Sequence, residues 1–311
     1  MDRRTQTNKP RVSICIPAYK LGESVRRLLI SIYNQDFQDF EVIITDDSPD
    51  DTVKREIADF LLNGNLRYIH NQIPLGPPDN WNFAISHACG QYIKIMHHDD
   101  FFASSHALSA FVDQLEKDPS VNLVFSDCYV INEQQEITRY FSINFSELDK
   151  ARKDPRHFFW KNFVGSPSVT MVRSSAVQDF DTNLKWLVDL DWYIRLSTTG
   201  RLAHIQEPLI LVSSGLPSQV TATCSGNPSI ECYEHVYLAK KIFHKPASLG
   251  LIRHFAILFS RCDMSTIKDI KVASGLQCLP TYCIVGLYLS KLILAIKRLR
   301  ASLLAKYRPA R

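Results

Sequence analysis

The sequence lacks the glycine-rich loops that commonly hold the phosphates of a bound nucleotide. The first apolar run, Val12–Pro17, is followed by Ala18-Tyr19-Lys20-Leu21-Gly22, which contains neither G-x-G-x-x-G nor a G-K-[ST] ending. Dinucleotide-dependent dehydrogenases and P-loop enzymes are therefore excluded. Any diphosphate bound by this chain would need a metal ion, rather than a glycine nest, to neutralise its charge.

Cysteine pairs are also missing. The eight cysteines are scattered singly, without a CxxC pair or a His/Cys spacing that suits zinc, so we expect buried, reduced thiols. Hydrophobic residues make up 45% of the chain and charged residues 22%, which excludes a disordered chain, a collagen-like repeat and a small disulfide scaffold. The first residues, MDRRTQTNKPR, have no apolar core, so we expect no signal peptide and a cytoplasmic protein.

Acidic residues are absent from the end of the chain. None follows Asp269, whereas eight basic residues do: Lys271, Lys291, Lys297, Arg298, Arg300, Lys306, Arg308 and Arg311. Without these eight, 28 Lys and Arg face 32 Asp and Glu, so the net charge changes from +4 to −4. Residues 279–296 carry one charge and approach the roughly 20 apolar residues that span a bilayer. Followed by cations, such a segment fits a helix that lies on, or dips into, an anionic inner membrane leaflet. The alternative is a helix that caps the domain and ends in solvent.

Strand and helix signals alternate five times in the first part of the chain. Short apolar, β-branched runs predict strands at 12–17, 41–45, 66–70, 92–96 and 121–126. Between the first two, Val25, Leu28, Leu29 and Ile32 have the i, i+3, i+4, i+7 spacing of a helix face. This alternation predicts an α/β fold with a doubly wound, parallel sheet.

The regular alternation of strand and helix signals ends after residue 127. A hairpin around 132–136 and a helix at 189–199 are followed by a loop, 214–230, that is rich in Ser, Gly and Pro. We place the domain boundary in this loop, with a first domain of residues 1–225 and a mainly helical extension of residues 226–311.

Pairs of aspartates stand at the ends of two predicted strands. Asp46-Asp47 directly follows the second strand, and Asp99-Asp100 directly follows the fourth. Open α/β sheets bind ligands outside the carboxyl ends of their strands. Mg²⁺ and Mn²⁺ take one or two carboxylates and complete their coordination with phosphates and water, so these pairs predict a metal ion and a polyphosphate. The alternative is that aspartates at strand ends only form turns.

Four segments together resemble family 2 nucleotide-sugar glycosyltransferases of the bacterial surface-polysaccharide type. They are VSICIPAYK (12–20), SIYNQDFQDFEVIITDDS (31–48), DNWNFAISHACGQYIKIMHHDD (79–100) and WLVDLDWYIRL (186–196), and the likeness extends over residues 10–225. The resemblance implies a GT-A fold, in which a mixed, mainly parallel sheet has helices on both faces. The mainly helical C-terminal extension lies outside this likeness.

The resemblance implies a binding site for the nucleotide base. Pro17, Ala18 and Tyr19 would line the base, with the Tyr19 ring stacking on it. Asp47 would accept a hydrogen bond from a base N–H. A base pocket of this kind suits a pyrimidine, so UDP or dTDP is the preferred donor.

The resemblance also implies a metal site beside the nucleotide. Asp99 would bond the ribose, and Asp100 would ligate Mn²⁺ or Mg²⁺ across the diphosphate. Asn80, Asn82 and Lys94 match a segment that would position the sugar-nucleotide.

On the acceptor side, Asp189 matches the general base that removes a proton from the acceptor hydroxyl. Asp191 lies roughly 200° away on a helix and cannot share that face, whereas Trp192 at i+3 would flank Asp189 with an aromatic acceptor surface. Two departures from the family pattern are Val188, where a Glu is usual, and the loop 213–219, which lacks the His or Arg of many relatives.

These roles predict an inverting, metal-dependent transferase acting in cell-surface polysaccharide synthesis. Inversion is expected because no second carboxylate suits a covalent intermediate. The enzyme would add one sugar per encounter, because the Gln-x-x-Arg-Trp signature of processive synthases is absent. We expect a hydroxyl-bearing saccharide acceptor, which a lipid-linked saccharide would satisfy, a location on the inner face of the cell membrane, and no nucleic-acid partner. The alternatives are a degenerate sugar-nucleotide-binding scaffold, which Val188 keeps open, and a nucleotidyltransferase with a related sheet.

Overall fold

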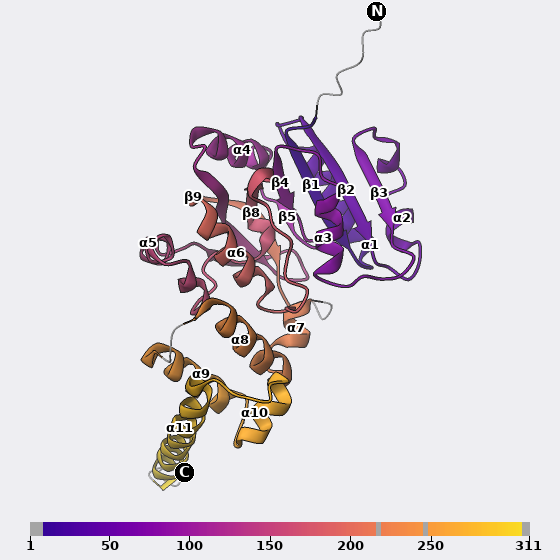
Figure 1. Cartoon of the computed structure of the whole chain (residues 1–311). Coiled ribbons are helices and arrows are strands. Elements are labelled where there is room, and N and C mark those ends of the chain that lie inside the picture. The colour runs from indigo at the N-terminus through magenta and orange to yellow at the C-terminus, as the bar shows by residue number, and fades with distance from the viewer. Residues whose placement is uncertain (1–8, 216–218, 245–247, 307–311) are drawn as a thin grey trace, which may run out of the picture. The chain divides into compact units, whose positions relative to one another are not determined.

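The chain folds as two units. The computed structural model describes residues 9–215, 219–244 and 248–306, with 297–306 described by their backbone alone (Figure 1). The two compact units are Met1–Leu216 and Pro217–Arg311. A short helix, α7 (Val220–Cys224), occupies part of the predicted loop 214–230 and belongs to the second unit. The division therefore falls nearer the N-terminus than residue 225.

The described residues of the first unit form one nine-stranded sheet with the strand order β3-β2-β1-β4-β8-β6-β9-β5, and β7 pairs with β6 outside this path. The strands are β1 (Val12–Ala18), β2 (Phe40–Asp46), β3 (Leu66–His70), β4 (Tyr92–Ile95), β5 (Phe101–Phe102), β6 (Val121–Ile131), β7 (Ile137–Phe141), β8 (Thr170–Arg173) and β9 (Arg201–Ser213). Strands β1 to β4 pair in parallel, as do β6 and β9, whereas β8 runs antiparallel to both β4 and β6. The predicted α/β fold with a mixed sheet is confirmed.

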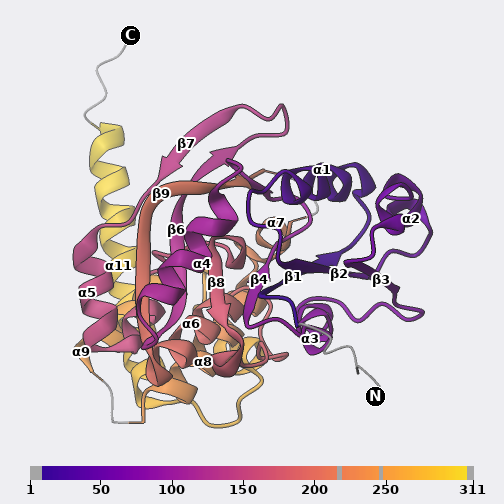
Figure 2. The ribbon, with the colours of Figure 1, turned by 90° about the horizontal axis from the view of Figure 1, so that it is seen from above.

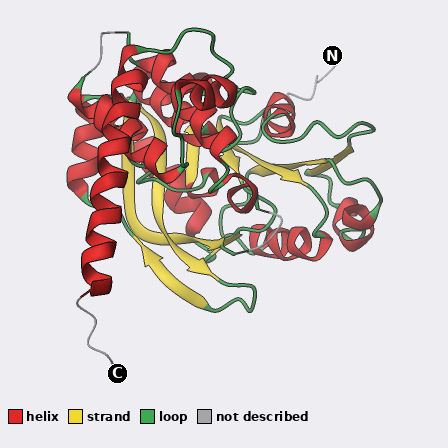
Figure 3. Cartoon of the chain, turned by 90° about the horizontal axis from the view of Figure 1, so that it is seen from below, coloured by secondary structure: helices red, strands yellow, loops and turns green. Residues whose placement is uncertain are grey.

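Helices cover both faces of this sheet. Figure 2 shows α1 and α2 on one side of β1, β2 and β3, and α3 on the other, and Figure 3 shows the strands as one twisted sheet among the helices. The helices of the first unit are α1 (Gly22–Tyr33), α2 (Thr52–Glu56), α3 (Asp79–Ser86), α4 (Ala107–Lys117), α5 (Phe145–Lys153) and α6 (Val188–Thr199), with 3₁₀ turns at Phe60–Leu62, Pro155–Phe159, Pro167–Val169 and Ser174–Ala176.

Helix α1 illustrates how the sequence specifies these layers. Its predicted apolar face, Val25, Leu28, Leu29 and Ile32, is completely buried. Strand β1 is buried at every position, as expected of an apolar run covered by helices on both faces of a parallel sheet.

The parallel register brings several strand ends to one edge of the sheet. Ala18 at the end of β1 pairs with Asp46 at the end of β2. Strand β4 ends at Ile95, one residue before the predicted end. Asp99 and Asp100 consequently lie in a turn between β4 and β5, in which the Asp100 amide donates to the His97 carbonyl at 3.0 Å.

The described part of the second unit is helical, and the prediction of a mainly helical extension is confirmed. Besides α7 it contains α8 (Pro228–Ile242), α9 (Leu249–Arg261), α10 (Ile267–Ser274) and α11 (Thr281–Lys306). Helices α9 and α11 pack closely: the Phe255 and Tyr282 rings stack at 5.1 Å, and a Cβ added at Gly286 would meet the Cβ of Phe255 at 3.0 Å. Within the described ranges, none of the helices is both long enough and apolar enough to cross a membrane.

All eight cysteines are free thiols. Five are buried as predicted: Cys15, Cys128, Cys224, Cys232 and Cys283. Cys262 is half-buried. The prediction was wrong for Cys89 and Cys278, which are exposed and lie outside the helices and strands.

Candidate active site

The turn after β4 places Asp100 inside the protein, where its carboxylate accepts hydrogen bonds from other segments of the first unit. Oδ1 accepts from the Ser213 amide at 2.9 Å, and Oδ2 accepts from Ser166 Oγ at 3.4 Å. The Ser213 hydroxyl also donates to the main-chain oxygen of Asp99. The end of β9 therefore holds both aspartates. We did not predict a role for Ser213; its position as the final residue of β9 was the available signal.

Burial raises the pKa of Asp100 above its ordinary value, and the adjacent Asp99 charge raises it further. A divalent cation would offset both effects, and two adjacent carboxylates are a suitable donor set for Mg²⁺ or Mn²⁺. No group of three His, Cys, Asp or Glu side chains in the described residues could hold a metal by itself. The site thus fits an ion that takes its remaining ligands from phosphates and water.

A single segment, residues 162–168, connects Asp100 with Asp189. Asn162 Nδ2 lies 3.3 Å from Asp189 Oδ2, and Asn162 Oδ1 accepts from the Gly165 amide at 2.8 Å. Ser166, one residue later, makes the contact to Asp100. The four Cα–Cα steps from residue 162 to residue 166 can span at most about 14 Å, so the two carboxylates lie in one region of the first unit.

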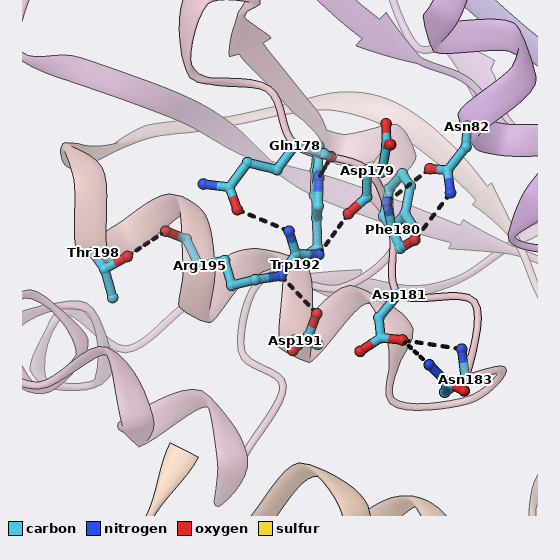
Figure 4. A network of polar contacts seen from close by, with 10 residues as sticks. All are labelled: Asn82, Gln178, Asp179, Phe180, Asp181, Asn183, Asp191, Trp192, Arg195 and Thr198. Carbon is cyan, nitrogen blue, oxygen red and sulfur yellow. Dashed lines mark hydrogen bonds and ion pairs between the residues drawn. The ribbon is translucent and has the colours of Figure 1, made fainter. Parts of the chain in front are cut away.

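Asp189 and Asp191 have different surroundings, although both lie in the first turn of α6. Asp189 is half-buried. Asp191 is completely buried and forms an ion pair with Arg195 at 2.7 Å. Figure 4 shows Arg195 reaching from Asp191 to Gln178 and Asp179. Asp191 thus anchors the chain before α6, and Asp189 is the carboxylate that remains partly accessible.

The predicted aromatic acceptor surface at Trp192 is wrong. Trp192 is completely buried, donates from Nε1 to the Gln178 carbonyl at 2.7 Å and stacks on Phe180 at 4.5 Å (Figure 4). Tyr193 is also buried and donates to the Gly165 carbonyl at 3.1 Å. Trp192 does lie one turn after Asp189 on α6, but the Trp192 and Tyr193 side chains pack into the core.

The side chains of Asn80 and Asn82 hold protein segments together. Asn80 is buried and donates to the Thr45 carbonyl at 3.0 Å. Asn82 bonds the Phe180 backbone twice, donating to its carbonyl at 2.9 Å and accepting from its amide at 2.7 Å (Figure 4). The prediction that they position the sugar-nucleotide is corrected to a structural role, because their polar groups are already paired within the protein.

Lys94 is likewise not a contact for the sugar-nucleotide. Its side chain is completely buried, donates to the Ser168 carbonyl and lies 4.8 Å from the centroid of the Phe111 ring. Burial lowers the pKa of Lys94 well below its ordinary value, and the Asp100 charge opposes this shift. Lys94 thus anchors the segment 162–168 near Asp100.

The residues predicted to line the base lie at the ends of β1 and β2. Pro17 and Ala18 are buried, whereas the Tyr19 ring is exposed. Asp47 is buried and accepts from Asn71 Nδ2 at 2.7 Å and from the Gly76 amide at 2.7 Å. Asp47 therefore fixes the loop that follows β3, which leaves less of its carboxylate for a base N–H than we expected.

A mixed α/β sheet with an aspartate pair at the carboxyl end of a central strand is the fold of GT-A glycosyltransferases. Comparison with solved structures supports this fold: the chain resembles S. aureus TarS in complex with UDP-GlcNAc, with a TM-score of 0.63, 17% sequence identity, and coverage of 85% of this chain and 80% of that one.

Comparison with sequences identifies the family. The model of glycosyl transferase family 2 matches residues 13–180. An uncharacterized protein of Mycobacterium tuberculosis is 30% identical over 65% of this chain and 66% of its own length. The Campylobacter jejuni GalNAc(5)-diNAcBac-PP-undecaprenol beta-1,3-glucosyltransferase is 28% identical over half of each chain. The protein belongs to glycosyltransferase family 2 and is a glycosyltransferase.

Proposed function

We propose that this enzyme transfers one sugar per encounter from a nucleotide-diphosphate donor to a hydroxyl group of a saccharide, with inversion, in cell-surface polysaccharide synthesis. The observation that carries the proposal is the segment 162–168, which touches Asp189 at one end and Asp100 at the other. A single displacement requires that a general base and a carboxylate that binds the diphosphate lie in one region of the protein.

Asp189 acts as the general base. It takes the proton of the acceptor hydroxyl while that oxygen bonds the anomeric carbon and the bond from this carbon to the diphosphate oxygen breaks. Asn162 orients the Asp189 carboxylate by donating to Oδ2. The N-terminal turn of α6 favours the ionised carboxylate, because the helix dipole is positive at that end.

Asp100 would hold Mn²⁺ or Mg²⁺. When bound, the ion neutralises the charge that develops on the departing nucleotide diphosphate. Ser213 and Ser166 keep the Asp100 carboxylate in place through their hydrogen bonds to its two oxygens. Asp99 retains its proposed contact with the ribose.

The donor is a pyrimidine nucleotide sugar. Tyr19 supports this because its exposed ring follows β1 at the carboxyl edge of the sheet, where a base can stack on it. The TarS structure contains UDP-GlcNAc, which agrees with UDP as the preferred nucleotide. The name of the Campylobacter relative gives an undecaprenol-linked diphosphate acceptor, so a lipid-linked saccharide at the inner face of the membrane is the acceptor we propose.

Hydrolysis and transfer assays with UDP- and dTDP-sugars test this proposal. We expect turnover that requires Mn²⁺ or Mg²⁺ and that is lost in Asp189→Asn, with Asp149→Asn on the exposed surface of α5 as the matched control. Val188 favours a second candidate, a binding scaffold without catalysis, because it replaces the usual Glu beside Asp189. Donor binding without any turnover in the unmodified enzyme would support that scaffold and contradict the transferase.

A further inference from the structure

Helix α11 has one face that the described residues cover and another, apolar face that they leave exposed to solvent. The covered face, Tyr282, Cys283, Leu287 and Ser290, is buried in the second unit. On the other face four large apolar side chains are solvent-exposed, at 41%, 61%, 56% and 45% in chain order: Val285, Tyr288, Leu292 and Ile296. Their spacing of three, four and four residues places them in one line along the helix, which we name the apolar stripe.

The second unit around this stripe is strongly basic. Between residues 217 and 311 the sequence has fourteen Lys and Arg against four Asp and Glu. Lys291 lies within the length of the stripe, with its ammonium 5.6 Å from the centroid of the Tyr288 ring. Within the same helix the sequence adds Lys297, Arg298 and Arg300, whose side chains lie outside the described residues.

We propose that the apolar stripe and the cations of α11 dock the enzyme on the surface of an anionic phospholipid bilayer. Apolar side chains in a line gain free energy on entering the interface, and Lys and Arg next to them are attracted by anionic headgroups. The buried opposite face keeps α11 packed on α9, so the helix lies along the membrane surface as part of the folded unit.

Charge argues against a second copy of the chain as the occupant of the stripe. Two second units, each with an excess of ten positive charges, would repel each other across such an interface. An anionic lipid surface is complementary to the same excess. The purpose of docking rests on the proposed function, because a lipid-linked acceptor is reached only at the membrane.

Cosedimentation of the full chain with lipid vesicles tests the inference. We expect binding to vesicles of phosphatidylcholine with phosphatidylglycerol and little binding to pure phosphatidylcholine. Combined Tyr288→Ser, Leu292→Ser and Ile296→Ser should lower the binding by at least roughly tenfold, because the stripe can no longer enter the interface. Lys297→Gln, Arg298→Gln and Arg300→Gln together should lower it by roughly a hundredfold at low salt.

The matched control is Leu62→Ser with Ile137→Ser, which removes exposed apolar side chains from the first unit and should leave vesicle binding unchanged. Thermal melts of each variant verify its folding. Equal vesicle binding by the stripe variant and the control, or no vesicle binding by the unmodified chain, would overturn the inference. The inference would also be overturned if the unmodified chain formed a dimer in the absence of lipid and the stripe variant did not. Hydrolysis of the nucleotide sugar needs no membrane, so a failure of docking leaves that assay unaffected.

Discussion

The two units of this glycosyltransferase differ in charge and in what they expose. The first unit has 22 Lys and Arg against 28 Asp and Glu, and it buries Asp99 and Asp100 at the edge of its sheet. The second unit has fourteen Lys and Arg against four Asp and Glu, and it exposes an apolar helix face. Carboxylates suit a metal and a diphosphate; cations beside apolar side chains suit an anionic lipid surface. We therefore propose that the first unit performs the chemistry and that the second unit determines where it takes place.

The largest effect should come from Asp189→Asn. Loss of the general base should lower transfer by about 10²–10⁴-fold, because the acceptor proton then has no positioned carboxylate to receive it. Vesicle binding of the same variant should equal that of the unmodified enzyme. A parallel loss of transfer and vesicle binding would contradict the separation of roles between the units.

Gly165→Ala should have the next largest effect. Gly165 has φ +103°, a left-handed conformation that strains any residue with a Cβ by about 1–3 kcal/mol. Because Gly165 lies between Asn162 and Ser166, its displacement should lower transfer by roughly a hundredfold. Gly64→Ala, at a position without a positive φ and with open space around it, is the control and should keep full activity.

Lys94→Met should separate stability from activity. Removing the completely buried Lys94 ammonium relieves a desolvation cost of several kcal/mol. This gain in the free energy of unfolding exceeds the roughly 1–3 kcal/mol that is lost because the Ser168 carbonyl no longer has its donor. We expect a higher free energy of unfolding in urea together with about tenfold lower transfer, since the segment 162–168 loses its anchor. A variant with unchanged transfer would show that Lys94 does not position this segment.

Mild acid should destabilise the second unit more than the first, because two neighbouring buried histidines of the second unit have lowered pKa values, against His97, with a pKa of about 4, in the first. Burial lowers the pKa of His254 to about 3 and also lowers that of His235, whose ring lies 5.0 Å away. In the unfolded chain these histidines have a pKa near 6.5, so they are protonated at a higher pH than in the folded protein. The free energy of unfolding that is present above about pH 6.5 is therefore lost as the pH falls toward 3. Each pH unit below 6.5 should cost about 1.4 kcal/mol for His254.

Spectroscopy can assign this loss to a unit, because all four tryptophans lie in the first: Trp81, Trp160, Trp186 and Trp192. At pH 5 we expect helical circular dichroism to melt before tryptophan fluorescence, and His254→Phe to bring the two transitions together. Coincident transitions in the unmodified protein at pH 5 would contradict a separate acid-sensitive unit.

Local patterns predicted the helices and strands and the position of the Asp99-Asp100 pair after a strand, whereas the surroundings of buried polar residues depended on packing. The Leu28 face of α1 and the Asp99-Asp100 pair after β4 follow from periodicity and from the rule for strand ends. Trp192 and Lys94 were misassigned because nothing local indicates that α6 and β4 are covered at those positions. Ser213 was missed because it meets Asp100 across 113 residues of sequence.

The most direct test of the account is a thermal-shift titration of UDP with and without Mn²⁺ on three proteins: the unmodified enzyme, Asp100→Asn and Asp189→Asn. Because a ligand that binds the folded state raises its melting temperature, the account predicts a Mn²⁺-dependent UDP shift in the unmodified enzyme and in Asp189→Asn, and none in Asp100→Asn. A Mn²⁺-dependent shift that persists in Asp100→Asn, or that disappears in Asp189→Asn, would contradict it.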